Sequence, residues 1–342
     1  MTAVRPSLHL APMQDVTDLT FMRVLAGYGG ADVYVTEYFR VHEVSVLDPW
    51  ILRSIDENPT GRPIYAQMIG QDIPALVRSA KELLQHPVSG IDLNLGCPAP
   101  VVCKKEAGGG LLRNLPKIDA ILGALRDAIP TRFTVKTRIG YHTPDEFDAL
   151  LSLFSRHAID SLAIHARTVT ERYQTPVHPD CVRRAVECLT CPVVANGNMV
   201  DASTALAFHE KSGAAGLMIG RGAIRNPWIF DQVRSAFSGE PPHSPTCRDL
   251  LGYVLRLYEE IAQSSPDFDT LKHVHRMKKT MIYVTQGLDP DFEFQLRRAK
   301  SQSEFETICR RFLDHDDPMP ALPSENSKLF CGFSRLVRET TT

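Results

Sequence analysis

The stretch Gly90-Ile91-Asp92-Leu93-Asn94-Leu95-Gly96-Cys97-Pro98 predicts a buried strand that ends abruptly in a turn. Its apolar and polar residues alternate, which is the period of a strand, and Gly96 and Pro98 stop the strand from continuing past Cys97. In barrels built from strand–helix repeats, chemistry takes place at the carboxyl ends of the strands. The sequence therefore predicts that Cys97 presents its thiol to a pocket.

Further short apolar segments recur along the chain at spacings of roughly 25 to 30 residues, with helical periodicity between them, as a barrel of parallel strands requires. The turn after the first segment contains no glycine, whereas an open doubly wound sheet usually has a GxGxxG turn there. We therefore predict an α/β fold, a (β/α)8 TIM barrel, with the doubly wound sheet as the alternative. With 91–95, the predicted strands are 8–11, 33–37, 64–68, 133–138, 161–165, 192–196 and 216–219.

The composition changes after Phe237. A Pro-rich stretch over 238–246 is typical of a linker, and beyond it the strand signals largely vanish. We predict a catalytic barrel over 1–237 and a small helical domain over 247–342, whose last residues, from about 324, look irregular. The expected helices of that domain cover 250–261, 271–284 and 305–312.

The totals are those of an ordinary globular protein, with 342 residues, 43% hydrophobic and 23% charged. No window is apolar enough for a membrane span, and residues 1–13 lack the apolar core of a signal peptide, so we expect a cytoplasmic protein without a membrane partner. The 8 scattered cysteines favour reduced thiols over a disulfide framework. A formal net charge of -2 means that any nucleic acid would bind at a local basic patch.

Polar side chains follow several of the predicted strands and should converge on one mouth of the barrel. A single buried Asn, Gln or His is more often a structural hydrogen-bonding group, but a cluster at several strand ends favours a binding site. Glycines after the last two strands, with Arg221, suggest a phosphate site, and Lys136 within a strand requires an anion or a polar ligand. The candidates are Met13, Gln14, Gln67, Asn94, Cys97, Lys136, Arg138, His165, Arg167, Asn196, Gly197, Asn198, Gly220 and Arg221.

Buried cysteines are usually inert, but Cys97 stands at a strand end, and a protonated thiol can serve there as a general acid. Cys188 and Cys191 form a single CxxC pair at a helix-to-strand turn without a second pair. We therefore predict no metal site. Basic residues gather near Cys97, at Lys104, and in the helical region, at Lys278 and Lys279, where they are either solvated surface or RNA contacts.

Several of these segments together form a family pattern that runs in order from about residue 8 to 237 and continues more weakly around 277–283. The chain resembles the tRNA-dihydrouridine synthases. The resemblance is carried by Leu10-Ala11-Pro12-Met13, Asp92-Leu93-Asn94-Leu95-Gly96-Cys97-Pro98-Ala99-Pro100-Val101-Val102, the loop 107–112, Val135-Lys136-Thr137-Arg138-Ile139-Gly140, Ile164-His165-Ala166-Arg167-Thr168, Ala195-Asn196-Gly197 and Met218-Ile219-Gly220-Arg221-Gly222.

The resemblance implies an FMN-bound barrel with a helical tRNA-binding domain, which reduces the C5–C6 bond of tRNA uridines with electrons from NADPH or NADH. It assigns the general acid to Cys97, which protonates C5 after hydride transfer to C6. Asn94 and Arg167 would orient the uracil, and Lys104, Lys278 and Lys279 would contact the tRNA. The residues expected to bind FMN are Pro12, Met13, Gln14, Gln67, Lys136, His165, Asn196, Gly197, Asn198, Gly220 and Arg221.

Residues 36–41 are similar to those of a bacterial subgroup that acts on uridine 16. Two other interpretations stay open. The first is a flavoenzyme that acts on free pyrimidines, which would share the barrel and FMN but would not explain the basic residues of the helical region. The second is an RNA-binding protein built on an inactive barrel, which would not need Cys97, Lys136 and His165. No obligate protein partner is evident.

Overall fold

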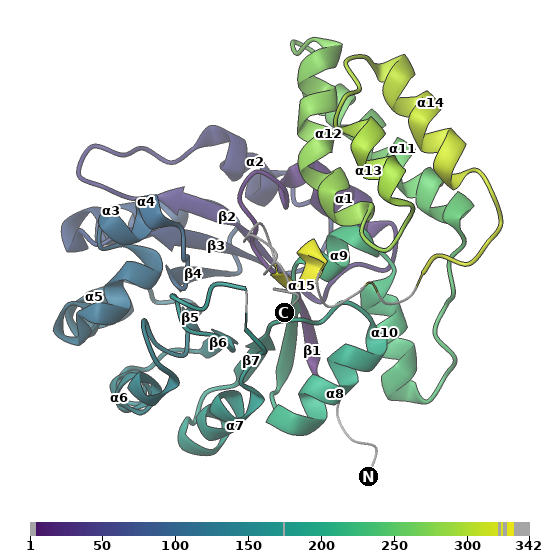
Figure 1. Ribbon diagram of the computed structural model, residues 1–342. Helices are drawn as coiled ribbons and strands as arrows, with labels where there is room; N and C mark the ends of the chain where they lie inside the picture. The colour runs from purple at the N-terminus through teal and green to yellow at the C-terminus, as the bar shows by residue number, and fades with distance from the viewer. Residues whose placement is uncertain (1–4, 174, 321–322, 324–326, 332–342) are drawn as a thin grey trace, which may run out of the picture.

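The computed structural model describes residues 5–173, 175–320, 323 and 327–331, and its centre is a closed barrel of parallel strands (Figure 1). Each strand pairs with the next along the chain, and β8 closes the barrel by pairing with β1. The predicted TIM barrel is confirmed. The strands are β1 (Ser7–Leu10), β2 (Val33–Arg40), β3 (Ile64–Ile69), β4 (Gly90–Leu95), β5 (Phe133–Arg138), β6 (Ser161–His165), β7 (Val193–Asn196) and β8 (Gly216–Ile219).

Strand β2 departs most from its predicted limits, because it continues to Arg40 instead of ending at Glu37. Its pairing with β3 shifts register between Val35 and Tyr38 and then resumes. Such a bulge admits an extra residue and re-aims the side chains that follow it. The extension brings Tyr38 to the mouth of the barrel.

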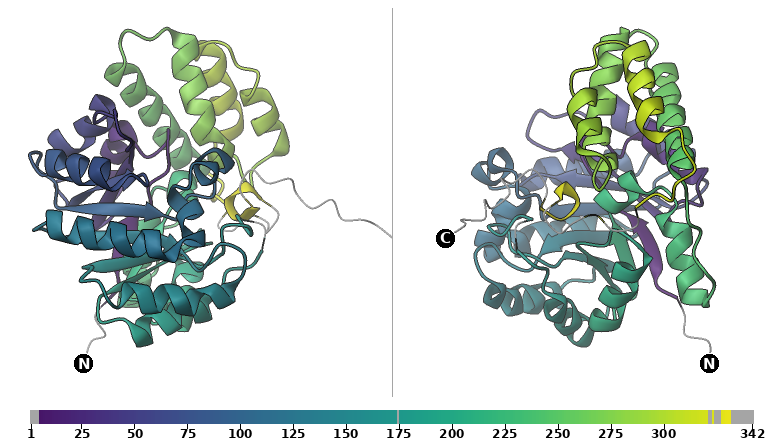
Figure 2. Two further views of the ribbon diagram at one scale, coloured as in Figure 1. Left: turned by 90° about the vertical axis from the view of Figure 1, so that its left-hand side faces the viewer. Right: turned by 45° about the vertical axis from the view of Figure 1, so that its right-hand side comes forward.

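The helices that follow the strands surround the barrel (Figures 1 and 2). Asp18 caps α1, because its carboxylate accepts the backbone N–H of Phe21 at 3.1 Å. These elements are α1 (Leu19–Ala26), α2 (Pro49–Asp56), α3 (Ile73–Leu83), α4 (Pro100–Lys104), η1 (Gly108–Arg113), α5 (Leu115–Ala128), η2 (Pro144–Glu146), α6 (Phe147–Phe154), α7 (Pro179–Cys188), α8 (Ala202–Ser212), α9 (Arg221–Arg225) and α10 (Ile229–Ser238).

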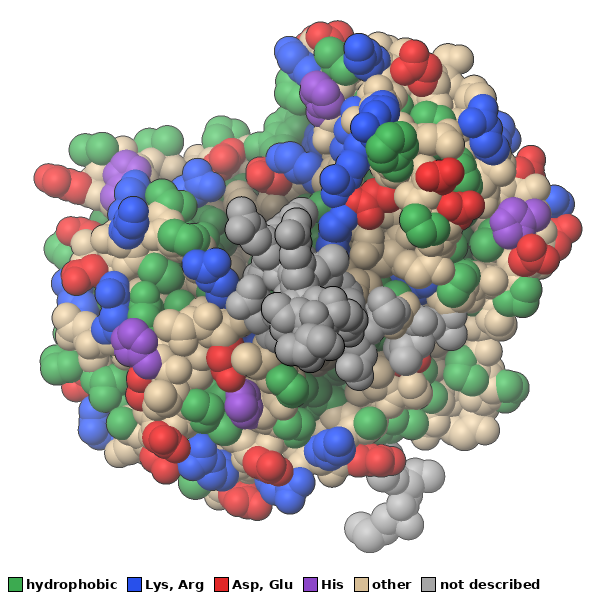
Figure 3. Space-filling model, in the orientation of Figure 1, with side chains coloured by type: hydrophobic (Ala, Val, Ile, Leu, Met, Phe, Trp, Pro, Cys, Tyr) green, Lys and Arg blue, Asp and Glu red, His purple; other side chains and the backbone are tan. Residues whose placement is uncertain are grey.

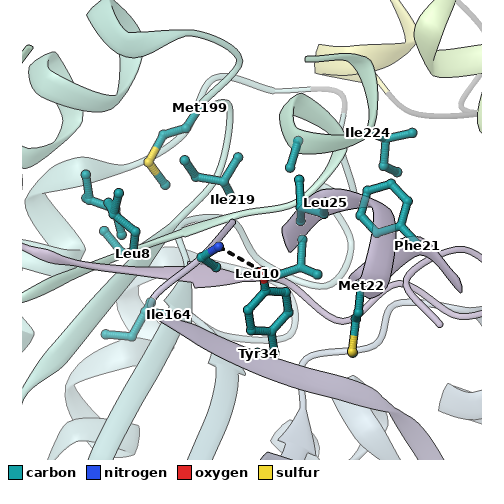
Figure 4. Packing of buried hydrophobic residues seen from close by; sticks show 14 of the residues in the cluster. Leu8, Leu10, Phe21, Met22, Leu25, Tyr34, Ile164, Met199, Ile219 and Ile224 are labelled. Carbon is teal, nitrogen blue, oxygen red and sulfur yellow. Dashed lines mark hydrogen bonds between the residues drawn. The ribbon is translucent and has the colours of Figure 1, made fainter. Parts of the chain in front are cut away.

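The main hydrophobic core lies between the strands and these helices. Figure 4 shows Leu10 of β1 and Tyr34 of β2 beside Phe21 and Met22 of α1, all four buried. A second, smaller cluster comes from the opposite faces of the strands and fills the inside of the barrel. Because side chains pack against both the outer and the inner face of the strands, the carboxyl-terminal mouth of the barrel is the place for a ligand.

The remaining helices pack together in one group beside the barrel (Figure 2), where α11 contacts α1 and α12 contacts α9. The three predicted helices are present, and α13 and α15 were not predicted. Residues 328–331 were expected to be irregular but form α15, whereas 324–326 and 332–342 lie outside the described residues. The division into domains at 237 and 247 stays a prediction. These helices are α11 (Cys247–Ser264), α12 (Thr270–Val284), α13 (Pro290–Leu296), α14 (Gln302–Leu313) and α15 (Lys328–Cys331).

Polar contacts join these helices to the barrel. The guanidinium of Arg276 on α12 pairs with the carboxylate of Asp18, and Arg23 of α1 pairs with Glu260 of α11 at 3.1 Å. The buried hydroxyl of Tyr253 donates to the carbonyl of Ile224 at 2.9 Å. Across the described part of the chain, none of these helices combines the length and the apolar character needed to cross a bilayer.

Candidate functional site

A cavity of about 630 Å3 opens at the carboxyl-terminal mouth of the barrel. Its walls come from the ends of strands at both sides of the barrel, and its volume lies in the range of small-molecule and cofactor sites. The structure thus brings most of the predicted site residues together. Those that line it are Pro12, Met13, Gln14, Asn94, Cys97, Lys136, Arg138, His165, Asn196, Gly197, Asn198, Gly220 and Arg221.

The turn that carries Cys97 is fixed by the side chain of Asn94. Its Oδ1 accepts the backbone N–H groups of Gly96 at 3.0 Å and of Cys97 at 2.9 Å, and its amide donates to Gln67 Oε1 at 2.8 Å. The carbonyl of Cys97 in turn accepts the N–H of Gly109 at 3.1 Å. The thiol therefore lines the cavity on a backbone that is held from both sides of the residue.

Lys136 of β5 lines the same cavity, and its ammonium donates to Asn196 Oδ1 at 3.2 Å. Burial, and then the nearby guanidinium of Arg138, lower the pKa of Lys136 to about 8, although the carboxyl of Asp92 acts in the opposite direction. An ammonium in such a place gains from an anionic or polar ligand, because its charge is poorly solvated.

His165 of β6 is buried, and desolvation together with the charges of Arg138 and Lys136 lowers its pKa well below the ordinary value. The imidazole is therefore neutral at pH 7. Its Nδ1 has no hydrogen-bond partner within the described residues, and neither has Gln14 Oε1, another buried atom of a lining residue. Buried polar atoms are nearly always paired in native proteins, so these two atoms indicate the place of a polar ligand.

At the ends of β7 and β8, glycines expose bare backbone to the cavity. Gly197 has φ +137, where a Cβ would be strained and would lie 2.8 Å from Val177. A Cβ on Gly220 would stand 3.3 Å from Ala11 and 3.4 Å from Met13 Sδ, at the cavity wall. Backbone can thus approach a ligand closely here, beside the cationic Arg221.

Some predicted residues lie outside the cavity wall. Gln67 is buried beneath it, with its amide donating to Asp92 at 2.7 Å and its oxygen accepting from Asn94. Arg167 is buried too, and donates to Thr175 O at 2.6 Å and Asn198 Oδ1 at 3.0 Å. The structure does not bring these two to the cavity, because each is used in holding the residues that line it.

The three predicted RNA contacts lie at the rim and on α12. Lys104 lines a neighbouring pocket. Lys278 donates to Ala299 O at 2.6 Å. Lys279 pairs with Asp15 at 3.1 Å, and in this pair the Lys279 side chain is 53% exposed and the Asp15 side chain 63%. Figure 3 shows blue Lys and Arg side chains on the part of the surface where Figure 1 draws α12.

Several cavity residues were missed by the sequence analysis. Tyr38 reaches the cavity through the unforeseen extension of β2, while Arg172 and Tyr173 come from the loop between β6 and α7. Tyr283 and Leu329 come from α12 and α15, far along the chain. Among these, Tyr283 stood within the weak continuation of the family pattern, and Tyr38 stood within the stretch 36–41 that resembles a bacterial subgroup. The other three carried no periodicity or motif.

In the part of the chain that the structure describes, no three His, Cys, Asp or Glu residues are grouped to hold a metal ion. Cys188 is exposed and Cys191 half-buried, and both are free thiols. The expectation of no metal stays a prediction.

A comparison with protein families identifies the chain. The family model described as "Dihydrouridine synthase (Dus)" matches residues 9–315, which run from within β1 through the rest of the barrel and α11 to α14. The chain belongs to the dihydrouridine synthase family. The match includes every residue that lines the cavity except Leu329.

Relatives from this family are similar over nearly their whole length. A tRNA-dihydrouridine(16) synthase of Neisseria meningitidis serogroup B is 30% identical over 315 residues, which cover 89% of this chain and 93% of the relative. A tRNA-dihydrouridine(16) synthase of Cupriavidus necator is 30% identical over 318 residues, covering 88% of this chain and 95% of the relative.

Solved structures with low identity share the barrel. A 2-naphthoyl-CoA reductase superposes with a TM-score of 0.52 at 12% identity, covering 69% of this chain and 50% of the other. The old yellow enzyme homologue from Zymomonas mobilis gives a TM-score of 0.50 at 14% identity, covering 69% of this Dus family chain and 90% of the other. At such identities the likeness supports the fold alone.

Proposed function

We propose that this protein is an FMN-dependent oxidoreductase that reduces the C5–C6 bond of uridine 16 in tRNA, with NADPH or NADH as the electron donor. The observation that carries the proposal is the meeting of Cys97, Lys136 and the glycines after β7 and β8 around one cavity in a dihydrouridine synthase family chain. We propose position 16 because two similar relatives carry the name tRNA-dihydrouridine(16) synthase. We place the reaction in the cytoplasm and propose no obligate protein partner.

The cavity residues fit FMN. The unpaired Gln14 Oε1 and His165 Nδ1 can hydrogen-bond a polar ring, and Lys136 supplies a cation for an anionic one. At the other side, Gly197 and Gly220 leave room for a phosphate beside the guanidinium of Arg221. Pro12, Met13, Asn196 and Asn198 complete the residues that would hold it.

When bound, FMN supplies the hydride that adds to C6 of the uracil. Cys97 holds the proton at its Sγ and delivers it to C5, so that both hydrogens are accounted for. Asn94 keeps the thiol in place through the two backbone N–H groups that it accepts. The pyrimidine must leave the folded tRNA to enter the cavity, as bases do in other enzymes that act on them.

Loss of the thiol tests the acid. In Cys97→Ala we expect dihydrouridine formation to fall by roughly 100-fold or more, because a general acid contributes about that factor. The flavin content of the purified protein should not change. The matched control is Cys188→Ala, which removes an exposed thiol outside the cavity wall. Full activity of Cys97→Ala on tRNA would exclude the acid role.

Mapping of dihydrouridine in tRNA tests the whole proposal. Transfer RNA from a strain that lacks the protein should carry uridine instead of dihydrouridine at position 16, and expression of the wild-type chain should restore dihydrouridine there. The purified protein should be yellow. A colourless protein, or one that reduces free pyrimidines and leaves tRNA unchanged, would contradict the proposal.

A further inference from the structure

A second pocket adjoins the central cavity on the side of Cys97. We call it the lateral pocket. It has a volume of about 380 Å3, and three of its residues, Pro98, Pro100 and Arg172, also line the central cavity. It is lined by Pro98, Pro100, Cys103, Lys104, Arg113, Tyr141, Val169, Thr170 and Arg172.

The walls of the lateral pocket carry positive charge, and the nearby carboxylate of Glu146 is held by backbone, because it accepts the N–H of the lining residue Tyr141 at 2.6 Å. Three of the lining residues are cations, Lys104, Arg113 and Arg172, and none is a carboxylate. Glu171, next in sequence to Arg172, is held elsewhere, because it accepts the N–H of Thr168 at 2.7 Å and pairs with His178 at 2.8 Å. Within the described residues, neither Lys104 nor Arg172 forms an ion pair.

The surrounding structure holds the side chain of Arg113 and the backbone of Arg172. The guanidinium of Arg113 donates to Cys103 O at 3.0 Å and lies 4.7 Å from the centroid of the Tyr141 ring. Arg172 has a φ of +53, which is unfavourable for a residue with a Cβ. Its carbonyl is held by Arg138, whose buried guanidinium also donates to Thr168 O at 2.8 Å. Strained residues that are held in this way tend to occur at functional sites.

We propose that the lateral pocket binds a backbone phosphate of the tRNA next to the uridine that enters the central cavity. The inference rests on the proposed function and names a contact that this function needs. A nucleotide whose base faces Cys97 must leave the cavity with its ribose and phosphate over the rim, and Pro98, Pro100 and Arg172 form the rim shared with the lateral pocket. Lys104 and Arg172 then bind the phosphate oxygens, and the hydroxyl of Thr170 is a further donor.

A phosphate of the nicotinamide donor has the same chemistry, so the experiment measures both ligands. Lys104→Ala/Arg172→Ala is purified with FMN, and the affinity for tRNA is measured by filter binding at several salt concentrations. We expect binding roughly tenfold weaker than that of wild type, with the slope of log K against log salt smaller by about 1. In parallel, the bleaching of the flavin is followed against NADPH concentration without tRNA.

The control is Lys211→Ala, which removes one positive charge in the last turn of α8, at the opposite end of the barrel from the mouth. Its affinity for tRNA and its salt slope should equal those of wild type. Unchanged tRNA affinity in the double variant would overturn the inference. A higher NADPH requirement with unchanged tRNA affinity would also overturn it, by assigning the pocket to the dinucleotide. If the wild-type protein forms no dihydrouridine at all, the proposed function fails instead.

Discussion

Glu37, at the bulge of β2, is a buried carboxyl group that faces other acids. Its side chain accepts the N–H of Asp15, a residue with φ +63, and Asp18 lies nearby. Burial, and then the charges of Asp18 and Asp15, raise the pKa of Glu37 to about 8, although the guanidinium of Arg276 acts against this. Glu37 is therefore mostly protonated at pH 7 in the folded protein.

This pKa predicts how stability depends on pH. Between the ordinary value of 4.5 and about 8, the unfolded chain gives up the Glu37 proton while the folded chain keeps it, so this residue's contribution destabilises the fold as pH rises. Glu37→Gln stays neutral and keeps an oxygen for the Asp15 N–H. We expect its melting temperature at pH 8 to exceed that of wild type by a few degrees, and the gain to vanish near about pH 5.

Thermal denaturation at the two pH values checks this prediction. Glu43→Gln, at an exposed position of the loop after β2, serves as the control and should melt like wild type at both. An equal gain for Glu37→Gln at both pH values would mean that titration of Glu37 is not the cause.

Helix α12 is joined to the barrel by two ion pairs that differ in exposure. In the pair of Arg276 with Asp18 the side chains are 17% and 10% exposed, whereas in the pair of Lys279 with Asp15 they are 53% and 63% exposed. Arg276 also donates to Ser265 Oγ at 3.1 Å. Removing one partner of a buried pair leaves the other charge poorly solvated, while an exposed pair contributes little.

We therefore predict unequal effects from two substitutions on the same helix. Arg276→Ala should lower the free energy of unfolding by about 2–3 kcal/mol, because it leaves the carboxylate of Asp18 without its charged donor. Lys279→Ala should lower it by less than about 0.5 kcal/mol. Urea denaturation of the two variants beside wild type measures both values, and losses of equal size would contradict the interpretation of α12 as anchored through Arg276.

The elements show how far the sequence alone determines the structure. β5, β6 and β8 have their predicted limits. β6 and β8 are short, largely apolar runs, and β5 begins with the alternation of Phe133 and Val135 with polar residues that is typical of a strand. β2 was predicted too short, because Thr36 and Glu37 look like a strand end, yet both are buried and the pairing with β3 resumes beyond them. Local patterns locate an element well, but they do not encode a bulge that tertiary pairing imposes.

In the candidate site, too, some residues could be predicted from local sequence patterns and others could not. Residues at strand ends, such as Cys97 and Lys136, were predicted to meet because a barrel brings its strand ends together. Tyr283 and Leu329 reach the cavity only because the chain returns to the mouth through α12 and α15. The Lys328 carbonyl accepts from Arg221 at 3.0 Å across 107 positions, a contact that no local pattern encodes.

For the whole molecule, charge distribution matters more than the net charge of -2. Positive side chains stand on two sides of the mouth. Lys104 and Arg172 line the lateral pocket. On the other side, Lys278 of α12 lines a different pocket together with Arg297 and Arg298. If one tRNA contacts both sides while its uridine occupies the central cavity, both groups of cations belong to a single binding event.

This geometry predicts that losses on the two sides combine independently. Reversal of Lys278 and Lys279 to Glu should weaken tRNA binding by roughly tenfold without changing flavin content, as should Lys104→Ala/Arg172→Ala. For well-separated groups the free-energy losses add, so the combined variant should bind roughly 100-fold more weakly than wild type. Filter binding at one salt concentration measures all three variants. A combined variant no weaker than the worse of its parents would mean that the two sides hold tRNA in separate poses, because each loss would then affect only its own pose.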